Sequence, residues 1–492
     1  MANRRTVVRL GAQATAGLIA SAVIVAVIAA AIALPFPRHT VTPPSTRVVP
    51  TAGEGQRVCA GPVLSFANDA SAAGSLTPIG EVSVVTARAE PIGHEIRPGP
   101  IGFEISALAS VADAGRARTS LNLGPQVIAN PSRGTGELSL AAASESQSVA
   151  SGEVAGFAAS TCGEPSAESW LVAGSTEVGR TSLVLLSNPT LVTAVVSITV
   201  YGESGIVSTP GSNGIAVPAQ SQKIIALAGL APTVVAPVVH VASRGGLVFA
   251  TLQQSVVRGL EPGGVEMSTS SALPATTQTI PGVVFAKSPE VALGDSGSTR
   301  NDSAPIVRLV PTGDRDTVVT ITVASEDPAG PKQIFTATTK ALSVADVPLS
   351  GIGDGIYTVT VSADEPVVSA ARTTTIGAAG GRDFAWFASV APNNFHFAVA
   401  TTPDVPSRLH LVNPSRTLAV MVTVTPENGA PTAVTLDGGQ SFSLDTTATP
   451  RVVISNNGPV VASASFVGDG KLSAITIAPP DQRAAPLTVY TG

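Results

Sequence analysis

Short alternations of apolar and polar residues recur along most of this 492-residue chain, and they predict β-strands. The second half of the run AVVSITVYG (Ala194–Gly202) and the run TVVTITVASED (Thr317–Asp327) alternate with a period of two, which places their apolar side chains on one face. Between residues 58 and 162 the runs are shorter, and no helical period is sustained there. Abundant Val and Thr favour strands, while 47 Gly and 39 Pro supply turns. The pattern therefore predicts an all-β fold.

A longer pattern of about a hundred residues occurs three times. Each copy has an apolar strand that ends at a proline, namely LVLLSNP (Leu183–Pro189), IVRLVP (Ile306–Pro311) and LHLVNP (Leu409–Pro414). A second anchor follows as HVASRGGLVFA, VTVSADEPVVSA and VVISNNGPVVASA, in which a serine (Ser243, Ser362, Ser455) precedes a valine by five residues. We expect a hairpin around each serine. A repeat of this length matches one β-sandwich, so we predict tandem immunoglobulin-like β-sandwich domains.

The N-terminal segment predicts a single transmembrane helix. Arg4, Arg5 and Arg9 precede an uncharged core from Ala16 to Leu34, which is long enough to cross a bilayer. The arginines predict a cytoplasmic N-terminus and an extracytoplasmic remainder, on a single-pass cell-membrane protein. A cleaved signal peptide, which would make the protein secreted, is the alternative.

These features divide the chain into six predicted segments. They are a cytoplasmic tip and transmembrane anchor (1–36), a Pro/Thr-rich linker (37–57), a membrane-proximal β domain (58–165) and three β-sandwich repeats (166–275, 276–380 and 381–492). In the membrane-proximal domain QVIANPS (Gln126–Ser132) is similar to the proline anchors, which leaves open whether this domain is a fourth copy. The run DFAWFASVAP (Asp383–Pro392) is interpreted as the opening of the last repeat.

Composition and charge exclude some functions and predict one covalent bond. The formal charge is −6, which argues against a nucleic-acid partner, because such binders need a basic face. The cysteines are Cys59 and Cys162, and no further ligand lies near them at metal-site spacing. In an exported chain we expect them to form a structural disulfide, which closes a loop of about 100 residues and stabilises the fold by about 4–5 kcal/mol.

Few motifs in the sequence indicate chemistry. Gly294-Asp295-Ser296-Gly297 resembles the nucleophile loop of chymotrypsin-like proteases, but the upstream His94 and His240 lack a matching context. The acidic residues between Asp295 and Asp327 leave calcium binding open. Trp386, Phe387 and Phe395 are a small candidate platform for a carbohydrate. The five histidines are His39, His94, His240, His396 and His410, and none of them pair at ligand spacing. We therefore predict no catalytic, cofactor-binding or metal-binding residue, and no cofactor.

The run ESWLVAGSTEVGRTSLVLLSNPT (Glu168–Thr190), followed by ITVYG, VVHVASRGGLVFA and RDFAWFA, resembles an uncharacterised actinobacterial family, domain of unknown function 5719 (DUF5719). The resemblance implies an exported envelope protein with one N-terminal anchor and a β-rich exterior. It supplies no catalytic residue. In that family a glycosyltransferase gene is a frequent neighbour, which implies a link to envelope glycans.

The leading hypothesis is a non-enzymatic, membrane-anchored envelope protein that acts as a spacer or interaction platform. Its expected partners are the membrane and either an envelope protein or a wall glycan, because sandwich loops and edge strands are natural contact surfaces. One alternative is an accessory subunit of envelope glycan assembly or export. Another is a hydrolase with its site at the Ser296 loop or between domains.

Overall fold

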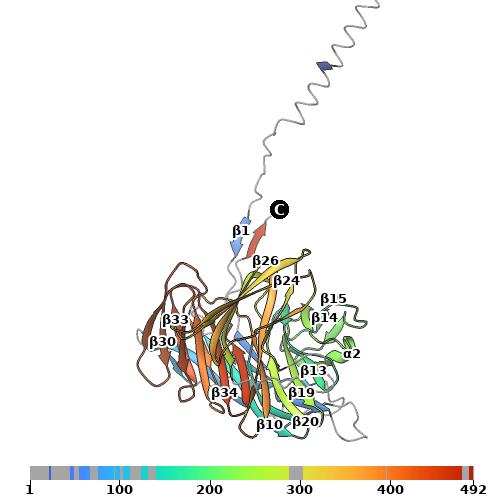
Figure 1. Ribbon diagram of the computed structural model, residues 1–492, viewed down its shortest axis with the longest axis horizontal. Coiled ribbons are helices and arrows are strands. Elements are labelled where there is room, and N and C mark those ends of the chain that lie inside the picture. The colour runs from blue at the N-terminus through green and yellow to red at the C-terminus, as the bar shows by residue number, and fades with distance from the viewer. Residues whose placement is uncertain are drawn as a thin grey trace, which may run out of the picture. The chain divides into compact units, whose positions relative to one another are not determined.

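The computed structural model describes residues 22–23, 45–48, 55–66, 76–92, 95–99, 104–110, 124–130, 140–286, 303–394, 396–478 and 487–490. The chain divides into two units, one of residues 1–50 with 484–492 and the other of residues 51–483. In the first unit β1 (Ser45–Val48) pairs antiparallel with β36 (Leu487–Tyr490). The second unit is called the body below, and it is almost entirely β-structure (Figure 1).

The predicted membrane anchor is not supported. Residues 22–23 are the described part of the segment from Ala16 to Leu34, and the rest of that segment lies outside the described residues. Across the parts of the chain that the structure describes, no helix is both long enough and apolar enough to cross a membrane. The predicted single-pass membrane localisation is therefore wrong.

The body contains four modules, which we call the N-terminal module (residues 55–161), repeat 1 (168–268), repeat 2 (275–388) and repeat 3 (397–476). The N-terminal module has strands β2 (Gly55–Cys59), β3 (Leu64–Phe66), β4 (Leu76–Pro78), β5 (Ser83–Ile92), β6 (Glu95–Gly99), β7 (Glu104–Ala107), β8 (Ala109–Ser110), β9 (Gln126–Asn130), β10 (Ala141–Ser151) and β11 (Val154–Thr161). Repeat 1 has β12 (Glu168–Leu171), β13 (Arg180–Asn188), β14 (Ala194–Gly202), β15 (Gly205–Val207), β16 (Ile215–Val217), β17 (Ser221–Ala226), the short helix α2 (Leu227–Leu230), β18 (Val238–Gly245), β19 (Phe249–Arg258) and β20 (Glu261–Ser268).

Repeats 2 and 3 follow the same plan. Repeat 2 has β21 (Ala275–Phe285), β22 (Ile306–Pro311), β23 (Thr317–Ser325), β24 (Lys332–Thr339), β25 (Ala345–Pro348), β26 (Gly355–Ile376) and β27 (Arg382–Ala388). Repeat 3 has β28 (Phe397–Ala400), β29 (Ser407–Val412), β30 (Val420–Pro426), β31 (Thr432–Leu436), β32 (Ser441–Asp445), β33 (Arg451–Asn456), β34 (Val461–Gly468) and β35 (Lys471–Thr476).

Each module has an inner sheet and an outer sheet. The inner sheets run β11-β10-β5-β6, β20-β19-β13-β17, β27-β26-β22-β25 and β35-β34-β29-β32. The outer sheets run β2-β9-β7, β12-β18-β14-β15, β21-β26-β23-β24 and β28-β33-β30-β31, and in repeat 2 the two sheets share β26, so that they form one seven-stranded sheet. In the N-terminal module β10 lies between β5 and β11, just as β19 lies between β13 and β20 in repeat 1. These three strands of the N-terminal module therefore pair as in a repeat, but β6 precedes β7 in the chain, whereas β17 follows β14.

The all-β prediction is confirmed, but the predicted immunoglobulin-like arrangement is not supported. An immunoglobulin domain places strands A, B, E and D in one sheet and C, F and G in the other. Here the first strand of repeat 1, β12, pairs with β18 in the outer sheet, and β19 pairs with β13 in the inner sheet. β12 and β19 therefore lie in the opposite sheets from strands A and G of that fold, to which they correspond.

The serine anchors do not form hairpins. β18 pairs with β12 and β14, whereas β19 pairs with β13 and β20, so the chain leaves the outer sheet and enters the inner one between them. β33 and β34 do the same in repeat 3. In repeat 2 a single long strand, β26, pairs with β23 at its start and with β22 and β27 at its end. Strands that change sheets in this way form the corners of a sandwich.

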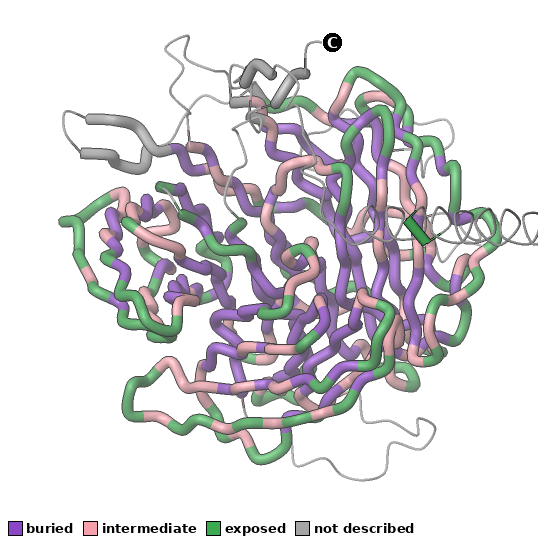
Figure 2. The backbone as a smooth tube through the Cα atoms, turned by 90° about the horizontal axis from the view of Figure 1, so that it is seen from above, coloured by how far each residue is buried: buried purple, intermediate pink, exposed green. Residues whose placement is uncertain are grey.

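The four modules close into one ring, because each core receives strands from its neighbour. The core of repeat 1 includes Phe384 and Trp386 of β27, and the core of repeat 2 includes Leu472 of β35. The core of repeat 3 includes Phe157 of β11, and that of the N-terminal module includes Met267 of β20. Figure 2 shows buried segments throughout the middle of the body. The modules are therefore not the independent tandem domains that the sequence predicts.

One carboxylate joins all four modules at the centre of this ring. Asp383 Oδ2 accepts hydrogen bonds from the backbone N–H groups of Phe157 (2.8 Å) and Leu472 (3.1 Å). Its Oδ1 accepts from those of Val265 (3.2 Å) and Phe384 (3.0 Å). The four donors lie on β11, β35, β20 and β27, which are the edge strands of the inner sheets. This contact uses donors that a sheet edge would otherwise leave unpaired.

Two glycines leave room for this carboxylate. An added Cβ would lie 2.6 Å from Asp383 Oδ1 at Gly156 and 2.8 Å from it at Gly264. Burial raises the pKa of Asp383 well above its ordinary value, against the effect of its four backbone hydrogen bonds. Burial also raises the pKa of the neighbouring Glu266, and the charge of Asp383 raises it further.

The strand that contains Trp386 ends repeat 2. β27 pairs with β26 from Arg382 to Ala388, so it completes the inner sheet of that repeat. The sequence instead places residue 381 at the start of the last repeat. β27 corresponds to β20 of repeat 1, because each is the last strand of its inner sheet and borders the ring centre.

The disulfide expected from the sequence is present. Cys59 and Cys162 are joined and fully buried, near the two ends of the N-terminal module. Beside them the Glu145 carboxylate accepts hydrogen bonds from the Ala60 and Gly61 N–H groups and from the Ser160 hydroxyl. Burial raises the pKa of Glu145 to about 7, although these hydrogen bonds lower it.

Candidate functional site

A cleft of about 480 Å³ lies between repeats 1 and 2. Its floor begins with Arg308, an arginine within the otherwise apolar anchor IVRLVP of β22. Ile306 and Val310, two residues away on either side, pack into the core of repeat 1, so the alternation of the strand turns Arg308 toward the same side. Arg308 is 1% exposed. A charge in the middle of a buried strand requires partners on the facing module.

The partners of Arg308 come from both repeats. Its Nε and Nη2 donate to the two carboxylate oxygens of Asp346 at 2.8 and 3.0 Å, which is a bidentate pair. Its Nη1 donates to the carbonyls of Gly174 (2.7 Å) and Pro237 (3.3 Å) in repeat 1. These contacts hold the guanidinium in one orientation across the boundary between the repeats.

An indole supports two of the arginines. The Cζ atoms of Arg308 and Arg372 lie 4.6 and 5.6 Å from the ring centroid of Trp386. The Trp386 Nε1–H donates to Gln254 Oε1 in repeat 1 at 2.8 Å. Trp386 is 2% exposed, so it lies beneath the cleft surface. Guanidinium groups that stack on an aromatic ring in this way are attracted by its quadrupole and lose less freedom when they bind a ligand.

The charged side chains that line the cleft have a net formal charge of +1. Its lining contains four arginines and three acidic residues, namely Arg180, Arg258, Arg308, Arg372, Glu177, Glu203 and Asp346. Backbone carbonyls orient further guanidinium groups, because Arg180 Nη1 donates to Val178 O and Arg258 Nη1 donates to Gly263 O. The lining of the cleft contains no histidine and no cysteine. The guanidinium groups are therefore the candidate ligand-binding groups of this cleft.

A second polar cluster lies between repeats 2 and 3 and has the connectivity of a hydrolase triad. His410 Nδ1 is 2.7 Å from Glu326 Oε2, and His410 Nε2 is 2.8 Å from Ser465 Oγ. Glu326 Oε1 also accepts from the Gly282 N–H at 3.0 Å. His410 is 0% and Ser465 is 1% exposed, so a substrate does not reach the hydroxyl in this structure. The cluster joins two repeats.

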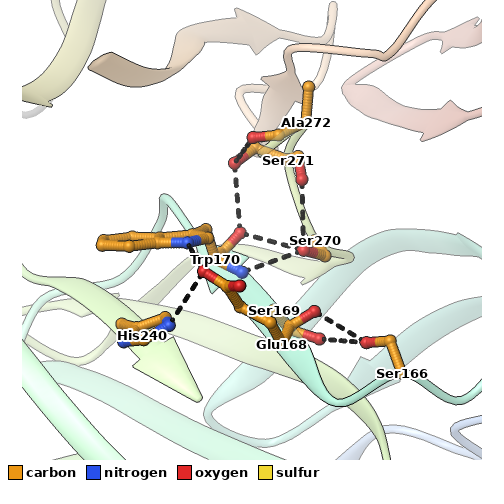
Figure 3. Close-up of polar contacts among 8 residues, drawn as sticks. All are labelled: Ser166, Glu168, Ser169, Trp170, His240, Ser270, Ser271 and Ala272. Carbon is orange, nitrogen blue, oxygen red and sulfur yellow. Dashed lines mark hydrogen bonds and ion pairs between the residues drawn. The ribbon is translucent and has the colours of Figure 1, made fainter. Parts of the chain in front are cut away.

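The tryptophan of repeat 1 has a structural role (Figure 3). His240 stacks on Trp170 with ring centroids 4.2 Å apart, and Glu168 Oε1 lies 2.9 Å from Trp170 Nε1 and 3.2 Å from His240 Nε2. Burial lowers the pKa of His240, against the charge of Glu168. The Trp170 backbone also bonds to Ser270 and Ser271, which lie in the segment that leads from repeat 1 to repeat 2. Trp170 thus holds the linker against β12.

The structure tests only part of the chemistry suggested by the sequence. Ser296, Asp295, His39 and His94 lie outside the described residues. His240 and His410 belong to repeats 1 and 3 and join different clusters, with Glu168 and Glu326 respectively. His396 is exposed.

The acidic residues of the proposed calcium segment serve separate purposes where they are described. Asp316 Oδ1 accepts from the Ala341 N–H, Asp327 Oδ1 accepts from the Ala329 N–H, and Glu326 binds His410. Among the described residues, the group of metal-type side chains that lies within 4.8 Å is Cys59, Glu145 and Cys162. The sulfur atoms of that group are bonded to each other, which removes them as thiolate ligands.

The suggested carbohydrate platform is wrong for two of its three residues. Trp386 and Phe387 are both 2% exposed, so neither offers a ring face to solvent, and Phe395 lies outside the described residues. No sequence motif indicates the cleft arginines as a group. The one signal that the sequence offers is Arg308, because an arginine in the middle of a buried apolar strand requires a polar partner across an interface.

Comparisons with known proteins identify the family but no activity. No curated protein matches this chain. A crystal structure of Thermotoga maritima protein 1070 is similar to 23% of this chain and 92% of its own, with 15% sequence identity and a TM-score of 0.20. The sequence pattern of a family of unknown function, DUF5719, matches residues 117–447. That range includes strands β9 to β11 of the N-terminal module, repeats 1 and 2 in full and part of repeat 3. The chain therefore belongs to the family of unknown function DUF5719.

Proposed function

We propose that this protein is a non-enzymatic binding protein, an interaction platform whose ring of four modules presents the cleft between repeats 1 and 2 to an anionic ligand. The observation that carries the proposal is the group of four arginines held on strands of two different modules around one cavity of about 480 Å³. That volume is within the usual range for small-molecule sites. Guanidinium groups match carboxylate and phosphate oxygens in geometry and charge.

The ligand class that fits best is a glycan segment with carboxylate or phosphate groups. The seven charged side chains of the lining include three acidic residues, and carboxylate oxygens are able to accept hydrogen bonds from sugar hydroxyls. The whole chain has a formal charge of −6, so long polyanions such as nucleic acids are repelled outside the cleft. Of the two partner classes expected from the sequence, an envelope protein or a wall glycan, the cleft favours the glycan.

The non-enzymatic part of the proposal rests on the chemistry of the two polar sites. The cleft lining offers no histidine or cysteine as a base or nucleophile. The Ser465 hydroxyl has a base at hydrogen-bond distance but is 1% exposed. A nucleophile must meet its substrate within about 3–3.5 Å to react. The accessory-subunit hypothesis for glycan assembly or export stays a prediction.

Calorimetric titration with defined sugars tests the proposal. We expect trigalacturonate, a carboxylated trisaccharide, to bind the full chain at low salt and neutral maltotriose to bind at least ten times more weakly. Added salt should weaken the binding of trigalacturonate, because the attraction is electrostatic. The double variant Arg180→Gln/Arg258→Gln should bind trigalacturonate at least ten times more weakly than the wild type.

Arg244→Gln is the matched control. Arg244 is exposed at the end of β18 and is not part of the cleft lining, so its replacement should leave the affinity unchanged. Equal affinity for the charged and neutral sugars would contradict the proposal. So would a double variant that folds with the urea midpoint of the wild type and still binds trigalacturonate normally.

A further inference from the structure

β24 forms an edge of the outer sheet of repeat 2 (Figure 1). It pairs with β23 along its whole length, from Lys332 opposite Ala324 to Thr339 opposite Thr317. No strand of the described part of the chain pairs with its other side. In an antiparallel sheet alternate residues of an edge strand direct their N–H and C=O groups away from the sheet. β24 therefore offers a row of backbone donors and acceptors to a further strand.

The corresponding edges of the other modules are shorter. β24 has eight residues, whereas β7 has four, β15 has three and β31 has five. Short edge strands are one of the ways in which proteins prevent unwanted pairing. Repeat 2 lacks this protection and also has no proline within β24. The long edge is thus a feature of this repeat and not a property of the shared strand order.

The side chains of β24 form two faces. Lys332, Ile334, Thr336 and Thr338 are exposed, and Ile334 has 62% of its surface accessible. Lys340, which follows the strand, continues this exposed face. On the other face Phe335 and Ala337 are partly buried and pack against the core of repeat 2. One face of an added strand would therefore lie beside Phe335 and Ala337 and extend the apolar layer over the core of repeat 2. Its other face would lie beside Lys332 and Lys340.

The charges disfavour a second copy of this chain as the added strand. An antiparallel pairing of β24 with itself over its full length, centred on Thr336, places Lys332 of each copy directly opposite Lys340 of the other. Like charges that face each other across strands are destabilising. Carboxylates at the same two positions would instead form cross-strand pairs with both lysines.

We propose that β24 is a docking edge for an extended segment of another protein, which adds to the sheet as an antiparallel strand. The segment has acidic residues opposite Lys332 and Lys340 and β-branched residues between them. Main-chain hydrogen bonds provide the affinity in this mode, and the alternating side chains provide the specificity. This protein-binding edge is separate from the cleft, and its test does not depend on the glycan proposal.

Two synthetic peptides test the docking edge on the full chain. The first is Glu-Val-Thr-Val-Thr-Val-Thr-Val-Glu, which places its glutamates opposite the two lysines, and the second has lysine at both ends. We expect the glutamate peptide to bind at least ten times more tightly at low salt. It should also protect alternate backbone amides of residues 332–339 from hydrogen exchange, because an added strand bonds to the N–H groups that point away from β23.

A charge reversal tests the specificity. The variant Lys332→Glu/Lys340→Glu should invert the preference, so that the lysine peptide becomes the tighter ligand. The control Lys223→Glu, on β17 in repeat 1, should bind both peptides as the wild type does. Equal binding of the two peptides, or binding without protection of β24, would overturn the proposal. A concentration-dependent dimer of the wild-type chain that protects β24 by itself would also overturn it, since the occupant would then be a second copy.

Discussion

Asp383 is the residue on which all four modules converge, and it accepts four backbone hydrogen bonds. We predict that Asp383→Asn destabilises the body by about 3–5 kcal/mol, because an amide directs N–H groups at backbone donors and leaves them unsatisfied. The free energy of unfolding in urea measures this. The control Asp437→Asn, at an exposed turn, should change it by less than about 0.5 kcal/mol. A similar small effect at residue 383 would show that the ring does not depend on this carboxylate.

Glu145 gives the stability of the protein a pH dependence. The pKa of its carboxyl is raised from 4.5 to about 7 by burial, so the folded state holds its proton at pH values where the unfolded state has released it. This contribution to stability is fully present below about pH 4.5 and is lost as the pH rises through about 7. The loss between these values is about 3 kcal/mol. Asp383 and Glu266, whose pKa values are also raised, act with the same sign.

The variant Glu145→Gln isolates this effect. Urea midpoints between pH 4.5 and 8 should fall more steeply with pH in the wild type than in the variant, because glutamine does not titrate. The comparison of slopes is independent of any constant stability cost of the substitution. Parallel curves for the two proteins would contradict the assignment to Glu145.

At the scale of elements, the strands that line the ring centre depend on glycine. Gly264 on β20 has φ +118°, and an added Cβ would lie 2.6 Å from Phe384 Cδ1. We predict that Gly264→Ala lowers the free energy of unfolding by more than about 3 kcal/mol, because neither Phe384 nor Asp383 can move away in a packed core. Gly259→Ala, in the turn before β20 with φ +64° and no atom near the added Cβ, should cost about 1 kcal/mol. Equal costs at the two positions would contradict the close approach at the centre.

Individual strands were predictable from the sequence, whereas their pairing was not. Alternation in the first and second repeats predicts strands that agree with β14 and β23 to within two residues, because each strand has one buried face and one more exposed face. The same alternation does not show which sheet a strand joins, so the sequence alone predicts a hairpin where the chain in fact crosses between sheets from β18 to β19. Sequence alignment also places Ser243 with Ser362 and Ser455. The structure shows that these serines do not have equivalent partners on the neighbouring strand. Ser243 lies opposite Val196, whereas Ser362 and Ser455 lie opposite Thr320 and Thr423.

The candidate sites were harder to predict from the sequence than the strands, because they are formed by contacts between modules. The Cys59–Cys162 bond was predictable, since the chain has two cysteines. The cleft brings Arg180 and Arg258 of repeat 1 together with Arg308 and Arg372 of repeat 2, and no spacing along the chain indicates that meeting. A single sequence shows the residues that each module contains, but the closure of the ring determines which of them become neighbours.

At the scale of the whole molecule, the shared cores predict cooperative unfolding. A chain that ends at residue 394 lacks repeat 3 and leaves Phe157 and Ala159 without the core that they enter. We predict that such a chain loses hydrogen-exchange protection in β10 and β11, although these strands are more than two hundred residues from the cut. A chain that ends at residue 483 retains all four modules and should keep full protection. Retained protection in the shorter chain would indicate independent modules.

The hydrogen bond from the Thr161 hydroxyl to the Thr476 carbonyl spans 315 residues of sequence, and it has a consequence for biosynthesis. A ribosome needs roughly 15 to 60 seconds to make that much chain, at about 5–20 residues per second. During this interval β11 of the N-terminal module lacks the core of repeat 3 against which Phe157 and Ala159 pack. The Cys59–Cys162 disulfide is a cross-link that can already form within this part of the chain. We therefore expect the protein to need a chaperone more before repeat 3 has been synthesised than after it.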